Sequence, residues 1–155
     1  MELTSEISLA GVEASEKEEF LALAEAYFKE MNPSFVPASD WRAEYYHRIE
    51  SDVRLRLRWI LFSGKRAGFV IFGTETHRFL PRTNGCIYEF YVLPDFRRTG
   101  VGRQAAELVI GQLHQEDPAK IQLEVATGNA AAAEFWRSFG FRSVSERYVL
   151  DKERT

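Results

Sequence analysis

The chain has 155 residues, 45% of them hydrophobic and 28% charged, with a formal net charge of −3. This length and composition predict a single domain over residues 1–155 with a core of its own. The weak negative charge argues against nucleic acid as a partner, no run of about 20 apolar residues suits a membrane span, and the lone Cys86 excludes an intramolecular disulfide. Because the N-terminus shows no signal-peptide pattern, we expect a cytoplasmic protein.

The N-terminal part predicts a strand followed by two helices. Residues 6–12 fit a short strand, and the spacing of Ser15 and Glu18 matches a capping box ahead of an amphipathic helix over 16–31. Prolines 33 and 37 end this helix. Asp40 is placed to cap a second helix. The residues that share one face of this second helix are Trp41, Tyr45 and Ile49.

The centre of the chain predicts a β-hairpin. Residues 53–59 alternate between apolar side chains and arginine, which is the period of a half-buried strand. A turn at 63–65 leads into a returning strand over 67–74. We expect the polar side of the first strand to face solvent. Its members are Arg54, Arg56 and Arg58.

The C-terminal half predicts alternating strands and helices after a polar loop. The expected elements are a strand at 86–93, a helix at 100–114, a strand at 120–126, a helix at 129–139 and an extended segment at 141–150. The resulting order, β-α-α-β-β-β-α-β-α-β, favours one sheet with helices on both faces. The chain's three histidines lack metal-ligand spacing, so we expect no metal site.

One loop combines several features of a phosphate site. The strand ending at Pro94 is followed by Arg97, Arg98, Thr99, Gly100, Val101 and Gly102, and then directly by a helix. A helix start exposes unpaired N–H groups and a partial positive charge, and glycine lets an anion approach the backbone closely. The same Gly-x-Gly pattern also occurs in an ordinary tight turn, so this feature alone leaves both interpretations open.

Two motifs in register resemble the GCN5-related N-acetyltransferase (GNAT) family. RRTGVG after VLPDF is similar to the family's pyrophosphate loop, with Arg97, Gly100 and Gly102 at its signature positions. NAAAEFWRSFGF, which begins at Asn129, looks like the family's second hallmark segment. The resemblance covers nearly the whole chain. It implies an α/β fold of the α+β type, whose mixed, mostly antiparallel sheet has six or seven strands, is splayed in the middle and carries helices on both faces.

The resemblance also implies acetyl-CoA as co-substrate. In the family, the pantetheine arm inserts beside the bulged strand, which points to the backbone of Phe90 and Val92. The N–H groups from Arg98 to Arg103 would bind the diphosphate. Asn129 would lie near the pantetheine or simply cap its helix. Trp136 is assigned to the same cofactor site, at the position where the family usually carries a tyrosine acid.

The implied reaction is transfer of an acetyl group to a primary amine by direct attack in a ternary complex. Glu89 is the candidate base or substrate anchor, although it could instead pair with an arginine, and Glu124 is the runner-up. An indole N–H is no practical proton source, so Trp136 leaves the general acid unassigned. Tyr88, Tyr91 and Tyr148 are the candidate substitutes, and we select Tyr91. Thiolate departure without an acid is the alternative.

The acceptor site is expected where the first two helices meet the splayed strands. Its candidate walls are Phe35, Trp41, Tyr45 and Tyr46, and Glu124 is assigned to the same site. A small-molecule amine and a peptide N-terminus both fit. Because only a short segment follows Phe141, we expect one closing strand or completion of the sheet in a homodimer. The rival function is a catalytically weak sensor that binds acyl-CoA.

Overall fold

The computed structural model of the chain describes residues 6–152. It forms two compact units, Met1–Leu123 and Glu124–Thr155. The first unit contains the whole sheet and three α-helices, and the second contains one α-helix. No helix within residues 6–152 has both the length and the apolar character required to cross a bilayer.

The first unit is built on a five-stranded sheet in which the strands follow one another in chain order. Neighbouring strands run antiparallel except for the last pair, which is parallel, so the predicted mixed and mostly antiparallel sheet is confirmed. The strands are β1 (Ile7–Gly11), β2 (Leu55–Phe62), β3 (Lys65–Thr76), β4 (Thr83–Val92) and β5 (Ile121–Leu123).

The expected count of six or seven strands is wrong for the described part of the chain. The strand predicted at 120–126 is only three residues long, and the segment 141–150 forms no strand. Strand β4, predicted at 86–93, begins earlier than expected, at Thr83, because residues 83–85 pair with residues 74–76 of β3. The polar loop is correspondingly shorter.

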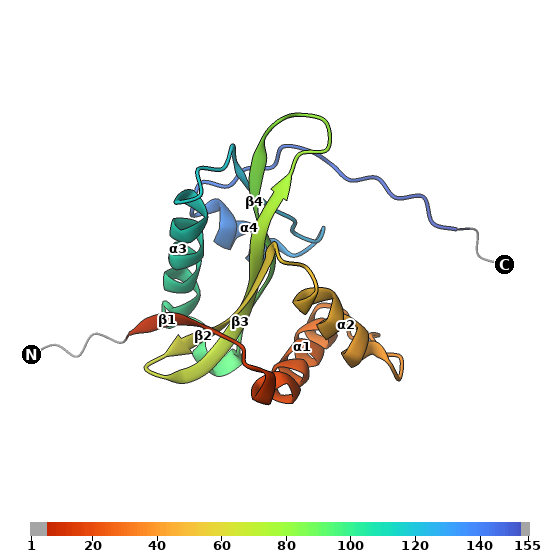
Figure 1. The fold of residues 1–155 in the computed structure, drawn as a ribbon, viewed down its shortest axis with the longest axis vertical. Coiled ribbons are helices and arrows are strands. Elements are labelled where there is room, and N and C mark those ends of the chain that lie inside the picture. The colour runs from red at the N-terminus through yellow and green to blue at the C-terminus, as the bar shows by residue number, and fades with distance from the viewer. Residues whose placement is uncertain (1–5, 153–155) are drawn as a thin grey trace, which may run out of the picture. The chain divides into compact units, whose positions relative to one another are not determined.

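Helices cover both faces of this sheet, as predicted (Figure 1). On one face lie α1 (Lys17–Met31) and α2 (Trp41–Glu50), and on the other lies α3 (Val101–His114). Asp40 occupies the N-cap position of α2, but its side chain makes no capping hydrogen bond. The face of α1 and α2 packs through aromatic rings, with Phe20 of α1 centred 5.1 Å from Phe69 of β3.

The first helix begins differently from the expectation. The capping box joins Glu13 and Glu16 rather than Ser15 and Glu18, because a short 3-10 turn precedes the helix and shifts its start to Lys17. The Glu13 N–H donates to Oε1 of Glu16 at 2.8 Å. The predicted helix over 16–31 is otherwise confirmed.

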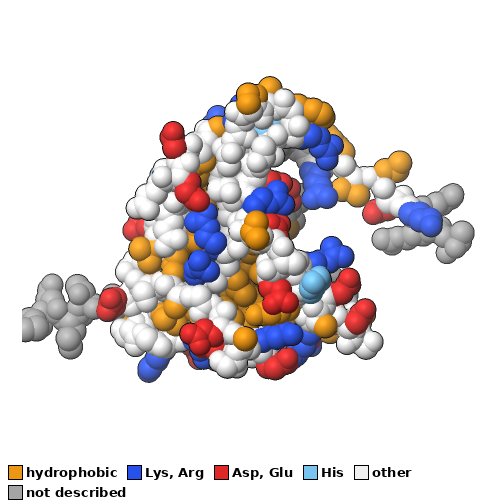
Figure 2. Space-filling view, viewed as in Figure 1, with side chains coloured by type: hydrophobic (Ala, Val, Ile, Leu, Met, Phe, Trp, Pro, Cys, Tyr) orange, Lys and Arg blue, Asp and Glu red, His pale blue; other side chains and the backbone are white. Residues whose placement is uncertain are grey.

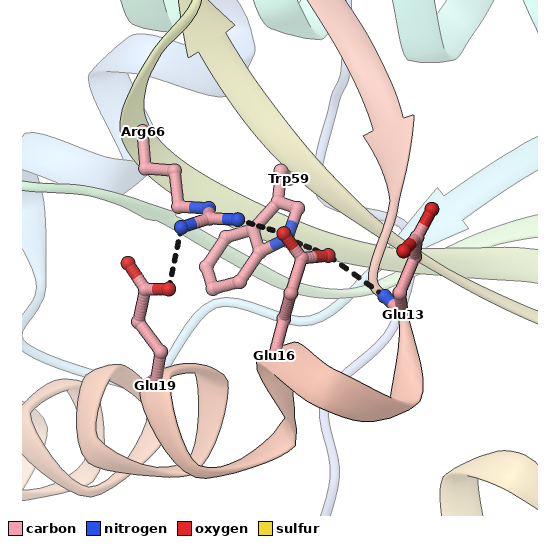
Figure 3. A network of polar contacts seen from close by, with 5 residues as sticks. All are labelled: Glu13, Glu16, Glu19, Trp59 and Arg66. Atoms are coloured by element: carbon pink, nitrogen blue, oxygen red, sulfur yellow. Dashed lines mark hydrogen bonds and ion pairs between the residues drawn. The ribbon is translucent and has the colours of Figure 1, made fainter.

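The carboxylate of Glu16 also ties the helix start to the sheet (Figure 3). It accepts hydrogen bonds from the guanidinium of Arg66 on β3 and, at 3.2 Å, from Nε1 of Trp59 on β2. The Arg66 guanidinium lies 4.5 Å from the centre of the Trp59 ring and also pairs with Glu19. This half-buried junction explains why Glu16, rather than Glu18, closes the capping box.

The arginine stripe of β2 is more enclosed than expected. Arg56 and Arg58 are half-buried, and the Arg56 guanidinium lies 5.1 Å from the centre of the Phe72 ring. It also forms an ion pair with Glu116, which follows α3. Arg56 and Arg58 therefore lie partly within the fold, whereas Arg54 is exposed and pairs with Asp52. Elsewhere, acidic and basic side chains both occur on the face shown in Figure 2.

The second unit is organised by α4 (Ala130–Arg137), which is shorter than the predicted helix over 129–139. Oδ1 of Asn129 accepts a hydrogen bond from the Ala132 N–H at 3.1 Å and caps this helix. Gly140, with φ of +98°, follows the helix as expected. The rings that pack together around the helix are Phe135, Trp136, Phe139 and Phe141. Residues 141–152 form neither helix nor strand, so completion of the sheet by a second copy stays a prediction.

Candidate active site

Strand β4 is bulged and only partly paired. Ile71 of β3 faces Glu89, whereas its neighbour Phe72 faces Ile87, so Tyr88 is an extra residue in β4. On its other side β4 pairs with β5 only as far as Ile87. Within the described chain, no strand pairs with the last five residues of β4 on that side. A bulge followed by an open strand edge is the geometry expected for this part of the sheet.

The open edge presents backbone groups of two predicted site residues. The Leu93 N–H donates to the Ala67 carbonyl of β3 at 2.7 Å. Because successive residues of a strand direct their N–H and C=O groups to opposite sides, those of Val92 and Phe90 are directed away from β3. The Val92 carbonyl accepts a hydrogen bond from Nε of Arg97 at 2.9 Å. Binding of a pantetheine arm along this edge stays a prediction.

The loop after β4 has the backbone geometry of an anion site. Arg98 and Gly100 both adopt left-handed conformations, with φ of +61° and +87°. The first hydrogen bond inside α3 runs from the Gln104 N–H to the Gly100 carbonyl at 3.0 Å, so the amides of Val101 and Gly102 precede it. Such a turn at a helix start directs successive N–H groups into one concavity, where an anion is stabilised.

The two arginines of this loop differ in their surroundings. The Arg97 guanidinium is held by Glu30 of α1, with Nη1 and Oε1 2.7 Å apart, and it lies 5.6 Å from the centre of the Tyr91 ring. This hydrogen-bonded arginine lowers the pKa of Glu30. Arg98 is exposed, and so is Arg103, which pairs with Glu107 along the helix. Arg98 is therefore the better placed of the two loop arginines to contribute charge to a bound diphosphate.

Glu89 projects from the bulge toward α1. Its Oε2 accepts a hydrogen bond from the hydroxyl of Tyr27, 62 residues away in the sequence. Burial raises the pKa of Glu89, and the hydrogen bond from Tyr27 opposes this rise. A raised pKa makes a carboxylate a stronger base, so Glu89 is suited to accept a proton, and its role as the base stays a prediction.

The sequence analysis did not identify Tyr27 as a site residue. It belongs to the apolar stripe of α1, and its ring packs against Phe69 and Tyr91 as the stripe predicts. No spacing of residues in the sequence indicates that this tyrosine contacts Glu89, which lies 62 residues away. The only available signal was the hydroxyl, which needs a hydrogen-bond partner when its ring is buried.

Three of the predicted acceptor walls lie together. Phe35, Trp41 and Tyr45 form one aromatic group, in which the rings of Trp41 and Tyr45 stack with centres 5.0 Å apart. The hydroxyl oxygen of Tyr45 is buried and has no hydrogen-bond partner among the described residues. Burial, together with the negative charge of Glu89, raises the pKa of Tyr45. Tyr45 therefore brings an unsatisfied polar group close enough to Glu89 for the two to interact.

Tyr91, the candidate acid, lies on the same strand as Glu89 and is almost fully buried. Its hydroxyl donates to Oε2 of Glu30 at 3.2 Å. Burial raises its pKa, and the charge of Glu30 acts in the same direction. A tyrosine in this environment keeps its proton at neutral pH.

The other predicted site residues belong to the second unit. Asn129 caps α4, and Trp136 packs among the phenylalanines of that unit. Glu124 does not lie on β5 as expected, because the strand ends at Leu123. Its side chain is exposed and meets Arg147, with Oε2 and Nη1 3.4 Å apart. The roles assigned to these three residues stay predictions.

Comparison with known proteins relates the chain to acetyltransferases. The sequence profile of the acetyltransferase (GNAT) family matches residues 19–141. The ribosomal protein bS18-alanine N-acetyltransferase of Escherichia coli K12 is 36% identical over 61 residues, which cover 39% of this chain and 41% of that enzyme. The chain thus matches less than half the length of this curated relative.

Solved structures share the fold across nearly the full chain. A ribosomal-protein-alanine N-acetyltransferase from Brucella melitensis biovar Abortus 2308 superposes with a TM-score of 0.71 at 17% identity, covering 96% of this chain and all of that one. The aminoglycoside N-acetyltransferase AAC(6')-Iy in complex with CoA gives 0.72, also at 17% identity, covering 100% and 99%. These likenesses establish the fold, and the match of the family profile over most of the sequence shows that the chain belongs to the GNAT acetyltransferase family.

Proposed function

We propose that this protein transfers the acetyl group of acetyl-CoA to a primary amine by direct attack in a ternary complex. The observation that carries the proposal is the position of Glu89. It is a half-buried carboxylate of raised pKa, and it lies on the bulge of β4 at the start of an open strand edge. The same strand leads into the loop at the start of α3. Donor and acceptor groups would meet between these features.

The donor side fits the chemistry of coenzyme A. The left-handed turn at Arg98 and Gly100, followed by the start of α3, supplies backbone N–H groups for a diphosphate. The open edge of β4 supplies alternating N–H and C=O groups for the two amides of a pantetheine arm. An N–H group at Phe90 or Val92 would stabilise the negative charge that develops on the acetyl oxygen during attack.

Glu89 supplies the acceptor chemistry. An alkylamine is mostly protonated at neutral pH and must lose a proton before it attacks. Glu89 accepts this proton, the amine nitrogen bonds to the acetyl carbonyl carbon, and the carbon–sulfur bond breaks as the thiolate leaves. The thiolate, whose conjugate thiol has a pKa near 8.5, can take its proton from solvent. For Tyr91 to provide this proton instead, its hydroxyl would have to leave its hydrogen bond with Glu30 and donate to the thiolate.

The acceptor is a small-molecule amine or a peptide N-terminus. Two observations support an acceptor site beside Glu89: the aromatic group of Phe35, Trp41 and Tyr45, and the unpartnered hydroxyl of Tyr45. The names of the similar enzymes point to both acceptor classes, an alanine of a ribosomal protein and an aminoglycoside. Aromatic walls with few polar groups are typical of sites that bind a compact ligand.

Thiol release from acetyl-CoA tests the proposal. The wild-type protein is assayed with peptides that begin with alanine, with aminoglycosides and with simple alkylamines, and we expect release with at least one class. Glu89→Gln should lower kcat/KM by about 100-fold, within the range for a lost general base. Glu124→Gln tests the runner-up base, and we expect it to lose less activity than Glu89→Gln. Binding of acetyl-CoA without release on any amine would overturn the proposal, and a loss confined to Glu124→Gln would overturn Glu89 as the base.

A further inference from the structure

We propose that Tyr27 of α1 is a positioning residue for Glu89, holding one carboxylate oxygen so that the other remains available to the acceptor amine. This inference rests on the proposed function, since it assigns Glu89 the role of base. It adds a residue from a helix whose sequence pattern indicates only packing. The hydrogen bond between the Tyr27 hydroxyl and Oε2 of Glu89 joins α1 to the bulge of β4.

The ring of Tyr27 is fixed by its neighbours. Its centre lies 5.1 Å from that of Phe28, 5.7 Å from that of Phe69 and 5.3 Å from that of Tyr91. The Phe69 ring meets it nearly edge-on, at an interplanar angle of 84°. A ring packed on several sides has little freedom to rotate, so its hydroxyl is a fixed donor. Such support is what keeps a reactive group in its productive geometry.

The two oxygens of Glu89 therefore differ. Oε2 accepts the hydrogen bond from Tyr27, and among residues 6–152 no hydrogen bond to Oε1 is found. Among the described residues, the titratable side chains that interact with the Glu89 carboxyl are Tyr27 from α1 and Tyr45 from α2, and no ion pair joins it to a lysine, arginine or histidine. Oε1 is thus the oxygen left to accept a proton.

Tyr27 is suited to donate throughout the working pH range. Burial raises its pKa, and the charge of Glu89 raises it further, so the hydroxyl keeps its proton. Its hydrogen bond stabilises the ionised form of Glu89 against the effect of burial. Without this bond the pKa of the carboxyl would rise further, and the ionised form that accepts a proton would be populated over a narrower range of pH.

A purely structural role explains this pair poorly. A carboxylate withdrawn from water is costly, and an apolar pair of similar volume at the same helix–sheet contact would be at least as stable. The rings around Tyr27 already supply the apolar packing. The hydroxyl and the carboxylate contribute chemistry to this contact that packing does not require.

The test compares Tyr27→Phe with Tyr46→Phe. Tyr46 lies on α2 and packs against Phe20 in the same aromatic core, but its hydroxyl makes no bond to Glu89. The pH dependence of kcat/KM is measured together with the ¹³C carboxyl titration of Glu89. In Tyr27→Phe, the pKa of Glu89 should rise by about half to one unit, the effect expected for one lost hydrogen bond. The acidic limb of the kcat/KM profile should move to higher pH by the same amount. In Tyr46→Phe, neither should move.

Thermal melting and acetyl-CoA affinity check that each variant is folded. Should Tyr27→Phe unfold, the hydroxyl proton of Tyr27 is followed in the wild type. A downfield resonance that is lost in Glu89→Leu, which has no acceptor, supports the proposal, and its absence overturns it. The positioning role is overturned if the acidic limb of the kcat/KM profile stays in place in Tyr27→Phe. It is also overturned if the limb moves equally in Tyr46→Phe. If no amine is acetylated yet the Glu89 pKa still rises in Tyr27→Phe, the proposed function fails and the positioning role fails with it, while the hydrogen bond itself stands.

Discussion

Arg97, in the loop after β4, forms an ion pair with Glu30 of α1, with Nη1 and Oε1 2.7 Å apart. The same arginine donates through Nε to the Val92 carbonyl at 2.9 Å. The arginine of the phosphate motif thus braces three parts of the fold: the end of β4, the loop that follows it and the last turns of α1. Both side chains are nearly half-exposed, so the ion pair itself adds little stability. Its importance lies in fixing the path of the loop.

Because the two loop arginines have different surroundings, their removal should lower the affinity for acetyl-CoA with a different dependence on salt. Arg98→Ala removes charge near the proposed diphosphate, so acetyl-CoA affinity should fall several-fold at low salt and the difference should shrink at high salt. Arg97→Ala removes the brace, so its loss of affinity should persist at high salt. Isothermal titration at two salt concentrations measures both. Equal salt dependence of the two variants would contradict this division of roles.

Gly100 is required for its backbone conformation rather than for space. A Cβ at this position would meet only Nε2 of Gln104, at 3.7 Å, but φ is +87°. Gly100→Ala should cost about 1 kcal/mol of stability because L-residues disfavour this region, and it should weaken acetyl-CoA binding. Gly111→Ala in the same helix, where a Cβ meets open space, should instead stabilise by up to about 1 kcal/mol. Chemical denaturation compares the pair, and destabilisation by both would contradict the argument.

The buried carboxyl of Glu89 should make stability depend on pH in a defined direction. Its pKa in the folded protein is raised above the ordinary value of 4.5. Below pH 4.5 the carboxyl is protonated in both states, and as pH rises through the folded pKa the native state increasingly bears the cost of a buried charge. Glu89→Gln should therefore melt at a higher temperature than the wild type near pH 7 and at nearly the same temperature near pH 4. A difference that grows toward low pH would contradict the raised pKa.

Removal of the Tyr45 hydroxyl should change stability and acceptor binding in opposite directions. Because its oxygen is buried without a partner in the described chain, Tyr45→Phe should stabilise the protein by about 1 kcal/mol. If that hydroxyl contacts the acceptor, KM for the amine should rise several-fold while KM for acetyl-CoA stays unchanged. Steady-state kinetics with each substrate varied in turn measures both. A variant that is both more stable and unchanged in KM would leave Tyr45 as a wall residue only.

The sequence predicts the elements well where a strong period coincides with tertiary packing. The stripe of α1, the alternation of β2 and the apolar run of β3 each produce the expected element, because all three pack on the same aromatic core. The start of α1 could not be predicted from local spacing. Glu16 is selected over Glu18 by Arg66 and Trp59, which reach it from the sheet.

The candidate site is predictable where it is local in sequence. The strand, the loop and the helix start from Glu89 to Gly102 follow one another, so their motif specifies their geometry. The contacts made by α1 are not local. Neither the bond from Tyr27 to Glu89 nor the pairing of Glu30 with Arg97 leaves a trace in spacing, because each joins residues more than 60 positions apart.

The edge of β4 beyond Ile87, with which no strand of the described chain pairs, has a further consequence for handling the protein. An open strand edge is a template for any extended polypeptide, including another molecule of the same chain. Occupancy of that edge by a donor molecule would remove the template. Resistance to aggregation during concentration or heating should therefore increase with coenzyme A, even in a variant that cannot turn over.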